Sequence, residues 1–290
     1  MTRYLLQQLV LGVLLGGLYG LAAAGLSLTF GVLKVLNIAH GELIMIGGYG
    51  AFWLFALLGL DPFLALVVVI PLAALLGAGL YAGLFAFVMR LDEETRIKNS
   101  LLVAFGLGLA FHALAVRLFT ADERAITTDY GGEVLRVAGL AVPVVRLASL
   151  VLAAALIGAL HWFLARRRWG RAIRAAAEDW EAASLVGIDV RRAYLLAFAI
   201  GTALAGAAGT LVSVGYSVSP VIGLEWTLKA LIVVVLAGLG SMVGTFVGGL
   251  VLGLAEAASA FAFGGPYREV VGLVLIVAIL VARPQGLFGR

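Results

Sequence analysis

Residues 166–192 read RRRWGRAIRAAAEDWEAASLVGIDVRR and form the longest strongly charged interruption in an otherwise apolar sequence. The stretch opens with five arginines in nine residues and closes with two more. Between them, residues 174–185 combine alanine, arginine and glutamate without proline or glycine, which predicts a helix. Gly187 follows, as is typical of a helix C-terminus. The sequence therefore predicts a short charged helix that separates two sets of apolar segments.

The composition places the rest of the chain in a membrane. Of its 290 residues, 63% are hydrophobic and 12% are charged, whereas soluble domains are about a quarter charged. A core of this size cannot bury so much apolar surface, so we expect lipid to be the solvent. The net charge of +4 comes from basic residues in short loops beside apolar spans, which favours membrane orientation over nucleic-acid binding. The lack of cysteine excludes disulfides and thiolate-held metals, and the three scattered histidines have no metal-ligand spacing.

The apolar segments predict an all-α, polytopic membrane protein with about eight or nine transmembrane helices, some of them broken or re-entrant. We expect residues 1–290 to form a single transmembrane domain. Glycines inside the segments predict small faces through which membrane helices pack closely. The segments fall at residues 9–30, 38–58, 63–89, 100–119, 143–165, 194–214, 227–240, 243–263 and 268–282.

Charged loops predict the orientation of these spans. The basic loop at 90–98 and the segment 166–193 should be cytoplasmic, because short cytoplasmic loops carry excess arginine and lysine. The loop 120–142 between them is rich in acidic residues and suits the outside. Arg283 and Arg290 place the C-terminus in the cytoplasm. The N-terminus stays open: it lies outside if residues 9–58 cross twice, and inside if they cross once with a re-entrant half.

Two regions resemble the broken helices that transporters place near the middle of the membrane, in corresponding positions of two halves. The first holds Lys34, Asn37, His40, Gly41 and Glu42 within a long apolar stretch. Charges at membrane depth are retained where they face protein or water. Lys34 and Glu42 could instead extend to the membrane surface. The cluster of Asn37, His40 and Gly41 favours a structured turn that lines or supports a path.

The second region runs from Glu225 and Lys229 to the turn around Gly240 and Ser241. Glu256, alone in the next apolar stretch, is either a buried, paired carboxylate or a group that faces the path. The candidate path residues are Asn37, His40, Gly41, Glu42, Glu225, Lys229, Gly240 and Ser241.

The charged segment carries a recognisable pattern. Glu181-Ala-Ala, followed by three residues and Gly187, resembles the EAA loop of bacterial ABC importer permeases, in which a short cytoplasmic helix docks on an ATPase subunit. The usual Ile-x-Leu-Pro continuation is replaced by Ala197-Phe-Ala-Ile200. Apolar and charged side chains together offer contact area and electrostatic steering. The resemblance implies coupling roles for Arg174, Glu178, Asp179, Glu181, Ala182, Ala183, Leu185 and Gly187.

Three blocks of sequence extend this resemblance to the permeases of branched-chain amino-acid ABC transporters, the LIV-H type. They begin at Gly17-Leu-Tyr-Gly, at Ile173-Arg-Ala-Ala-Ala-Glu178 and at Lys229-Ala-Leu, and they occur in the same order as in the family. The resemblance implies a multi-pass permease domain in the bacterial inner membrane. Its implied partners are a second related permease, two cytoplasmic ATPases and a periplasmic binding protein.

Nothing in the sequence supplies a nucleotide site. No Gly-x4-Gly-Lys-Ser/Thr loop occurs, and none of the three lysines follows a glycine. We therefore expect no cofactor in this chain, and ATP with magnesium in the partner ATPases. The chain is expected to be a transport subunit and not an enzyme.

Two other functions remain open at this point. A secondary carrier or channel would use Glu42, Glu225 or Glu256 for coupling, but gives no reason for the charged helix. An intramembrane enzyme would need a catalytic pair or a metal site, and His40-Gly-Glu42 lacks the His-Glu-x-x-His spacing. Among amino acids, amides and urea, no residue pattern identifies the ligand.

Overall fold

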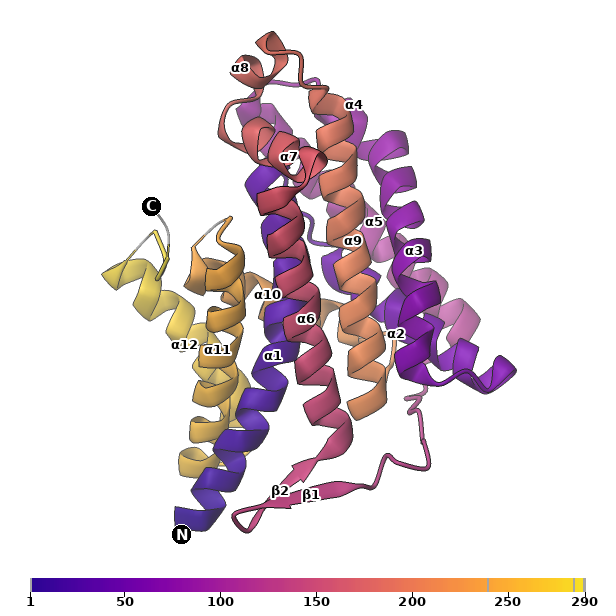
Figure 1. The fold of residues 1–290 in the computed structure, drawn as a ribbon, viewed down its shortest axis with the longest axis vertical. Helices are drawn as coiled ribbons and strands as arrows, with labels where there is room; N and C mark the ends of the chain where they lie inside the picture. The colour runs from indigo at the N-terminus through magenta and orange to yellow at the C-terminus, as the bar shows by residue number, and fades with distance from the viewer. Residues whose placement is uncertain (1, 239, 284, 289–290) are drawn as a thin grey trace.

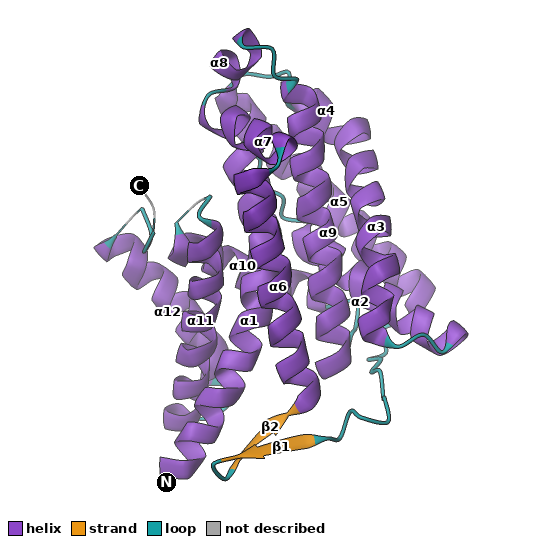
Figure 2. Cartoon of the chain, in the orientation of Figure 1, coloured by secondary structure: helices purple, strands orange, loops and turns teal. Residues whose placement is uncertain are grey.

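The computed structural model describes residues 2–238, 240–283 and 285–288, and it is helical apart from one small hairpin and the loops (Figure 2). The long helices are α1 (Thr2–Leu33), α2 (His40–Leu58), α3 (Pro62–Leu80), α5 (Glu93–Phe119), α6 (Val144–Arg166), α9 (Val190–Gly215), α10 (Ile222–Ala237), α11 (Met242–Phe263) and α12 (Tyr267–Ala282). The short elements are the π-helical turn η1 (Tyr81–Phe85), α4 (Ala86–Val88), α7 (Arg168–Glu178), α8 (Trp180–Leu185), β1 (Val134–Val137) and β2 (Leu140–Pro143).

Every predicted apolar segment forms a helix, so the all-α polytopic prediction is confirmed. Seven helices of the described chain are long and apolar enough to cross a membrane, with α3, η1 and α4 together forming one of them. Helices α10 and α12 have 16 residues each and are about 24 Å long. They are therefore shorter than the ~30 Å hydrocarbon layer.

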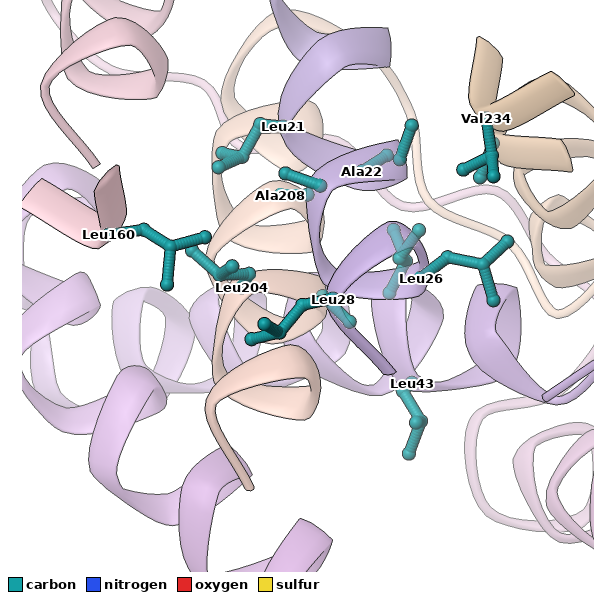
Figure 3. Packing of buried hydrophobic residues seen from close by; sticks show 14 of the residues in the cluster. Leu21, Ala22, Leu26, Leu28, Leu43, Leu160, Leu204, Ala208 and Val234 are labelled. Atoms are coloured by element: carbon teal, nitrogen blue, oxygen red, sulfur yellow. The ribbon is translucent and has the colours of Figure 1, made fainter. Parts of the chain in front are cut away.

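The core forms around α1 and α9, whose central residues are almost all buried. Leu21 and Leu28 of α1 lie on the side that faces Leu204 and Ala208 of α9 (Figure 3). Helix α5 is equally apolar but leaves most of its surface exposed. Because an exposed apolar helix is unfavourable in water, this surface fits contact with lipid.

Glycines bring α1 and α11 into close contact, as the small faces in the sequence predict. Gly12 and Gly16 stand four residues apart on α1 and face Gly249 and Gly253 of α11. A Cβ atom at Gly16 would lie 2.7 Å from the carbonyl oxygen of Gly249. This spacing lets the two backbones touch, which strengthens van der Waals contact where no hydrophobic effect operates.

The two ends of the bundle differ. The N-terminus and the β1–β2 hairpin lie at one end, which we call the hairpin end, and α7 and α8 lie at the other, the α8 end (Figure 1). Gln7 Nε2 donates to Ala141 O (2.6 Å), and Ala141 N donates to Gln7 Oε1 (2.8 Å). The N-terminus thus shares an end with loop 120–142. This arrangement agrees with the alternative in which residues 9–58 cross twice, as α1 and α2.

The hairpin was not part of the sequence prediction, which gives residues 120–142 only as an external loop. Val134 pairs with Pro143 and Val137 with Leu140. Ala138 and Gly139 have φ values of 51° and 78°, as a two-residue type I′ turn requires. Tyr130 Oη donates to Asp61 Oδ2 (2.5 Å) and ties this loop to the start of α3. Burial and this bond raise the pKa of Tyr130 to about 12, so its hydroxyl stays protonated near neutral pH.

Candidate translocation path and coupling segment

The helical backbone is interrupted between α1 and α2, where the first polar cluster is predicted. Lys34 ends α1 with a φ of 54° and is exposed. Asn37 is buried, and its Oδ1 accepts from Ala39 N (3.1 Å). His40 Nε2 donates to Ala22 O (2.8 Å), which fixes the tautomer of this buried ring. The Asn37 bond satisfies a backbone N–H of the turn and the His40 bond ties the turn to α1, so the turn is a structured element.

Helix α10 packs against the start of α2 through Thr227, a residue that the sequence analysis missed. Gly41 N donates to Thr227 Oγ1 (2.9 Å), and the Thr227 hydroxyl lies within 3.1 Å of Ile38 O and 2.9 Å of Gly223 O. A Cβ atom at Gly41 would overlap the Gly223 carbonyl. In the sequence, Thr227 is marked only by its position between the ionisable residues Glu225 and Lys229 in an otherwise apolar segment. Thr227 therefore joins the first break to α10. Because α10 is continuous from Ile222 to Ala237, the prediction of a broken helix at Glu225–Lys229 is wrong.

We expect Thr227→Val to lower the free energy of unfolding by about 1–3 kcal/mol, because the buried Gly41 N–H loses its acceptor while the side-chain shape is retained. Thr245→Val is the matched control, since the buried Thr245 hydroxyl makes a local bond, to the carbonyl oxygen of Ser241 at the N-cap of its own helix. Equilibrium unfolding in mixed micelles measures both changes. Equal effects in the two variants would contradict a special role for Thr227.

Glu42 is buried, in contrast to the exposed Lys34. It is 7% exposed, and within the described residues its Oε2 atom has no hydrogen-bond partner. The carboxylate lies against Gly223 of α10. It borders a cavity of about 270 Å³ that His112 and Thr227 also line. Glu42 is thus a buried group beside α10.

Glu256 is a buried, paired carboxylate, which is the first of the two alternatives that the sequence left open for this residue. Lys229 Nζ lies 2.5 Å from Glu256 Oε1, and Arg268 Nε lies 2.9 Å from Oε2. Tyr19 Oη also donates to Oε2 (2.8 Å). Glu256 is fully buried and Lys229 is 7% exposed on its side chain. This ionic cluster ties α1, α10, α11 and α12 together within the apolar interior.

Gly240 and Ser241 lie toward the α8 end and not beside the other path residues. Ser241 Oγ accepts from Gly244 N (3.1 Å) and caps α11. Both residues border a cavity of about 450 Å³ that Ile173 and Arg174 of α7 also line. The predicted path residues therefore form three groups at different places along the molecule. Helix α10 links the groups, because it contacts α2, carries Lys229 and leads into the turn before Ser241.

The charged segment forms two helices, so the prediction of one helix over 174–185 is wrong. Asp179 separates them with an extended backbone (φ −152°, ψ 103°), and its Oδ1 accepts from Glu181 N and Ala182 N, both at 3.0 Å. Aspartate is strongly preferred at such a capping position, so Asp179 starts a new helix instead of continuing the old one.

The predicted stop at Gly187 is confirmed. Gly187 has a φ of +84°. Gly187 N donates to Ser184 O and Ile188 N to Ala183 O, both at 3.0 Å, in the pattern of a Schellman motif.

Helix α7 is anchored in the bundle, and α8 projects from it (Figure 1). Ile173 is fully buried, and Gly170 lies against the backbone of α6. On α8, Ala183 is buried, whereas Leu185 and Val186 are 87% and 77% exposed. The exposed residues of the predicted coupling set are Arg174, Glu178, Asp179, Glu181, Ala182, Leu185 and Gly187. The α8 end thus presents an apolar tip among charged groups. Arg290, which supported the predicted place of the C-terminus, lies outside the described residues.

Comparisons with known proteins agree over nearly the whole chain. Residues 8–280 match the family described as "Branched-chain amino acid transport system / permease component". The chain is 34% identical to the high-affinity branched-chain amino acid transport system permease protein BraD of Pseudomonas aeruginosa, over 98% of this chain and 96% of that protein. It is 33% identical to the corresponding permease protein LivH of Escherichia coli K12, over 99% and 96%. Among solved structures, PsaBC from Streptococcus pneumoniae in complex with Fab is 14% identical, with a TM-score of 0.48, over 95% of this chain and 91% of that one.

Proposed function

This chain belongs to the family of branched-chain amino acid transport permeases, and we propose that it forms the membrane pathway of an ATP-driven importer for these amino acids. The observation that carries the proposal is the extent of the family match. Residues 8–280 include both predicted broken-helix regions, the ionic cluster and the segment α7–α8. The protein is a multi-pass membrane transport subunit.

The proposed complex contains a second related permease, two ATPase subunits and an external binding protein. We place the α8 end in the cytoplasm and the hairpin end outside, in a bacterial inner membrane, with the C-terminus cytoplasmic. The arginines of 166–192 and the acidic residues of loop 120–142 support this orientation. ATP and magnesium would bind to the ATPase subunits, and this chain would need no cofactor.

In this proposal, α8 is the contact through which ATP hydrolysis acts on the bundle. Leu185 and Val186 offer apolar area to a cleft in the ATPase. Movement of α8 would pass to α7, whose Ile173 is packed in the core with α1 and α9. The transporter would then alternate between outward-open and inward-open states whose populations ATP binding shifts.

The proposal is tested by purifying the protein from a strain that expresses its neighbouring transport genes and reconstituting the complex in liposomes. We expect ATPase subunits to copurify and external leucine to be taken up only with ATP inside and the binding protein outside. Uptake by the lone chain, driven by an ion gradient, would instead identify a secondary carrier.

Leu185→Glu is expected to weaken binding of the ATPase subunits by about tenfold, because a charge replaces an apolar contact at the centre of the interface. The fold should be unchanged, since this side chain is 87% exposed. Leu135→Glu, on the half-exposed hairpin at the opposite end, is the control. Subunit recovery in pull-down assays and coupled uptake measure the effect. Full recovery and uptake in Leu185→Glu would exclude α8 as the coupling contact.

A further inference from the structure

A cavity of about 420 Å³ opens at the hairpin end beside the ionic cluster. Its walls come from α1, α9, α10, α12 and the loop that joins α9 to α10, with one contribution from loop 120–142. Leu15, Val212 and Trp226 provide apolar surface, and tyrosine and serine hydroxyls and charged side chains of both signs also line the cavity. Sites for small molecules typically have volumes of about 300–1,000 Å³ and combine apolar walls with a few polar groups.

The positive side of the cavity is formed by Lys229 and Arg268. Both cations bond the single carboxylate of Glu256, so the buried cluster carries one more positive than negative charge. Arg268 uses its Nε atom for Glu256, and its side chain, which is 42% exposed, lines the cavity and has two further nitrogens that can donate to a ligand. A guanidinium in this position can bind a ligand carboxylate through two parallel hydrogen bonds.

The negative side is formed by Glu225 on α10. It stands four residues before Lys229, so the two side chains share one face of the helix. Glu225 is exposed, and Glu123 and Glu269 also line the cavity. The cavity therefore presents a carboxylate beside its two cations, a suitable partner for an ammonium group.

We propose that this cavity binds a free amino acid with an apolar side chain as its zwitterion. The ligand carboxylate would contact Arg268 and Lys229, its ammonium would contact Glu225, and its side chain would lie against Trp226, Val212 and Leu15. This assignment rests on the proposed function and gives it a binding site within one subunit.

The large groove between α2 and α3 is a poorer candidate for the same ligand. Its volume is similar, about 450 Å³, but its lining, in the described part of the chain, contains no charged side chain. A zwitterion placed there would lose the hydration of both charged groups without ionic partners, which is unfavourable. The cavity beside the ionic cluster provides partners for both groups.

The test compares three ligands on the intact permease–ATPase complex in nanodiscs, without the binding protein. Leucine carries both charges, 4-methylpentanoate lacks the ammonium, and leucinamide lacks the carboxylate. In the wild type, we expect each analogue to bind about tenfold or more weakly than leucine, since each leaves a charged group without its partner.

Two variants test the ammonium contact and the carboxylate contact one at a time. Glu225→Gln should weaken leucine binding by about tenfold and leave 4-methylpentanoate unchanged, while Arg268→Gln should weaken leucine similarly and leave leucinamide unchanged. Glu133→Gln and Arg136→Gln, on the exposed hairpin, are the matched controls and should bind all three ligands like the wild type. Melting temperatures verify that each variant is folded.

The outcomes separate the site from the function. If ATP-driven uptake of leucine occurs but both variants bind the three ligands as the wild type does, this cavity is not the binding site. The proposed importer function would still hold. An equal loss for all three ligands in each variant would also overturn the assignment of the two charged contacts. If the wild-type complex takes up no branched-chain amino acid, the proposed function itself fails.

Discussion

Gly253→Val is expected to prevent the protein from accumulating as a folded bundle. A Cβ atom at Gly253 would overlap the carbonyl oxygen of Gly12 and would lie 2.7 Å from Gly16 Cα and 2.8 Å from Gly16 N. These are backbone atoms of a buried helix and cannot rotate away, so α1 and α11 would have to separate along their whole contact. Overpacking a core costs about 1–3 kcal/mol where side chains can yield, and more where they cannot.

Gly158→Val is the matched control for this change. Gly158 lies on an exposed face of α6, and a Cβ atom there would meet nothing within 4 Å. We expect this variant to reach the membrane in normal amount and to elute as a single species in detergent. Comparable yields and elution profiles for both variants would show that the close α1–α11 contact is dispensable.

Glu256→Leu is expected to lower the free energy of unfolding by about 3–5 kcal/mol, because it leaves the ammonium of Lys229 buried without its counter-charge. Tyr19 loses its acceptor at the same time. Unfolding in mixed micelles measures the change. Glu94→Leu serves as the control, since it removes a pair whose side chains are 69% and 80% exposed. That loss should be within about 1 kcal/mol.

The double variant Lys229→Met with Glu256→Leu tests whether the loss of stability in Glu256→Leu comes from breaking the ion pair. Replacing both partners by apolar groups is often nearly neutral, whereas removal of one partner strands the other. We therefore expect the double variant to be more stable than Glu256→Leu alone. Additive losses from the two single changes would mean that Lys229 and Glu256 do not depend on each other.

The sequence alone determined the helical architecture. Each apolar segment is long and continuous, and in lipid the backbone satisfies its hydrogen bonds only within a helix or a closed barrel. The stop at Gly187 was likewise predictable, because glycine adopts the left-handed conformation that ends α8. The match of residues 181–187 to a family pattern was also visible, since such patterns depend on neighbouring residues.

Two features that the sequence analysis missed depend on the local backbone conformation of a few residues. Asp179 has acidic neighbours and lies in a helix-favouring stretch, yet its carboxylate bonds two backbone N–H groups and starts α8. The type I′ turn at Ala138 and Gly139 lacks the Asn-Gly or Asp-Gly signal that would have predicted it.

Only the tertiary structure decided which polar residues meet. Glu256 contacts Tyr19, which is 237 residues away in the chain, and Gly41 contacts Thr227 at a separation of 186. Helical periodicity orders side chains around one helix and carries no information on the neighbour that each face will contact. The polar groups in the sequence therefore indicated that broken helices and buried charges exist. Helix packing determined that Glu256 is paired, that Glu42 is buried while Lys34 is exposed, and that α10 joins the three groups.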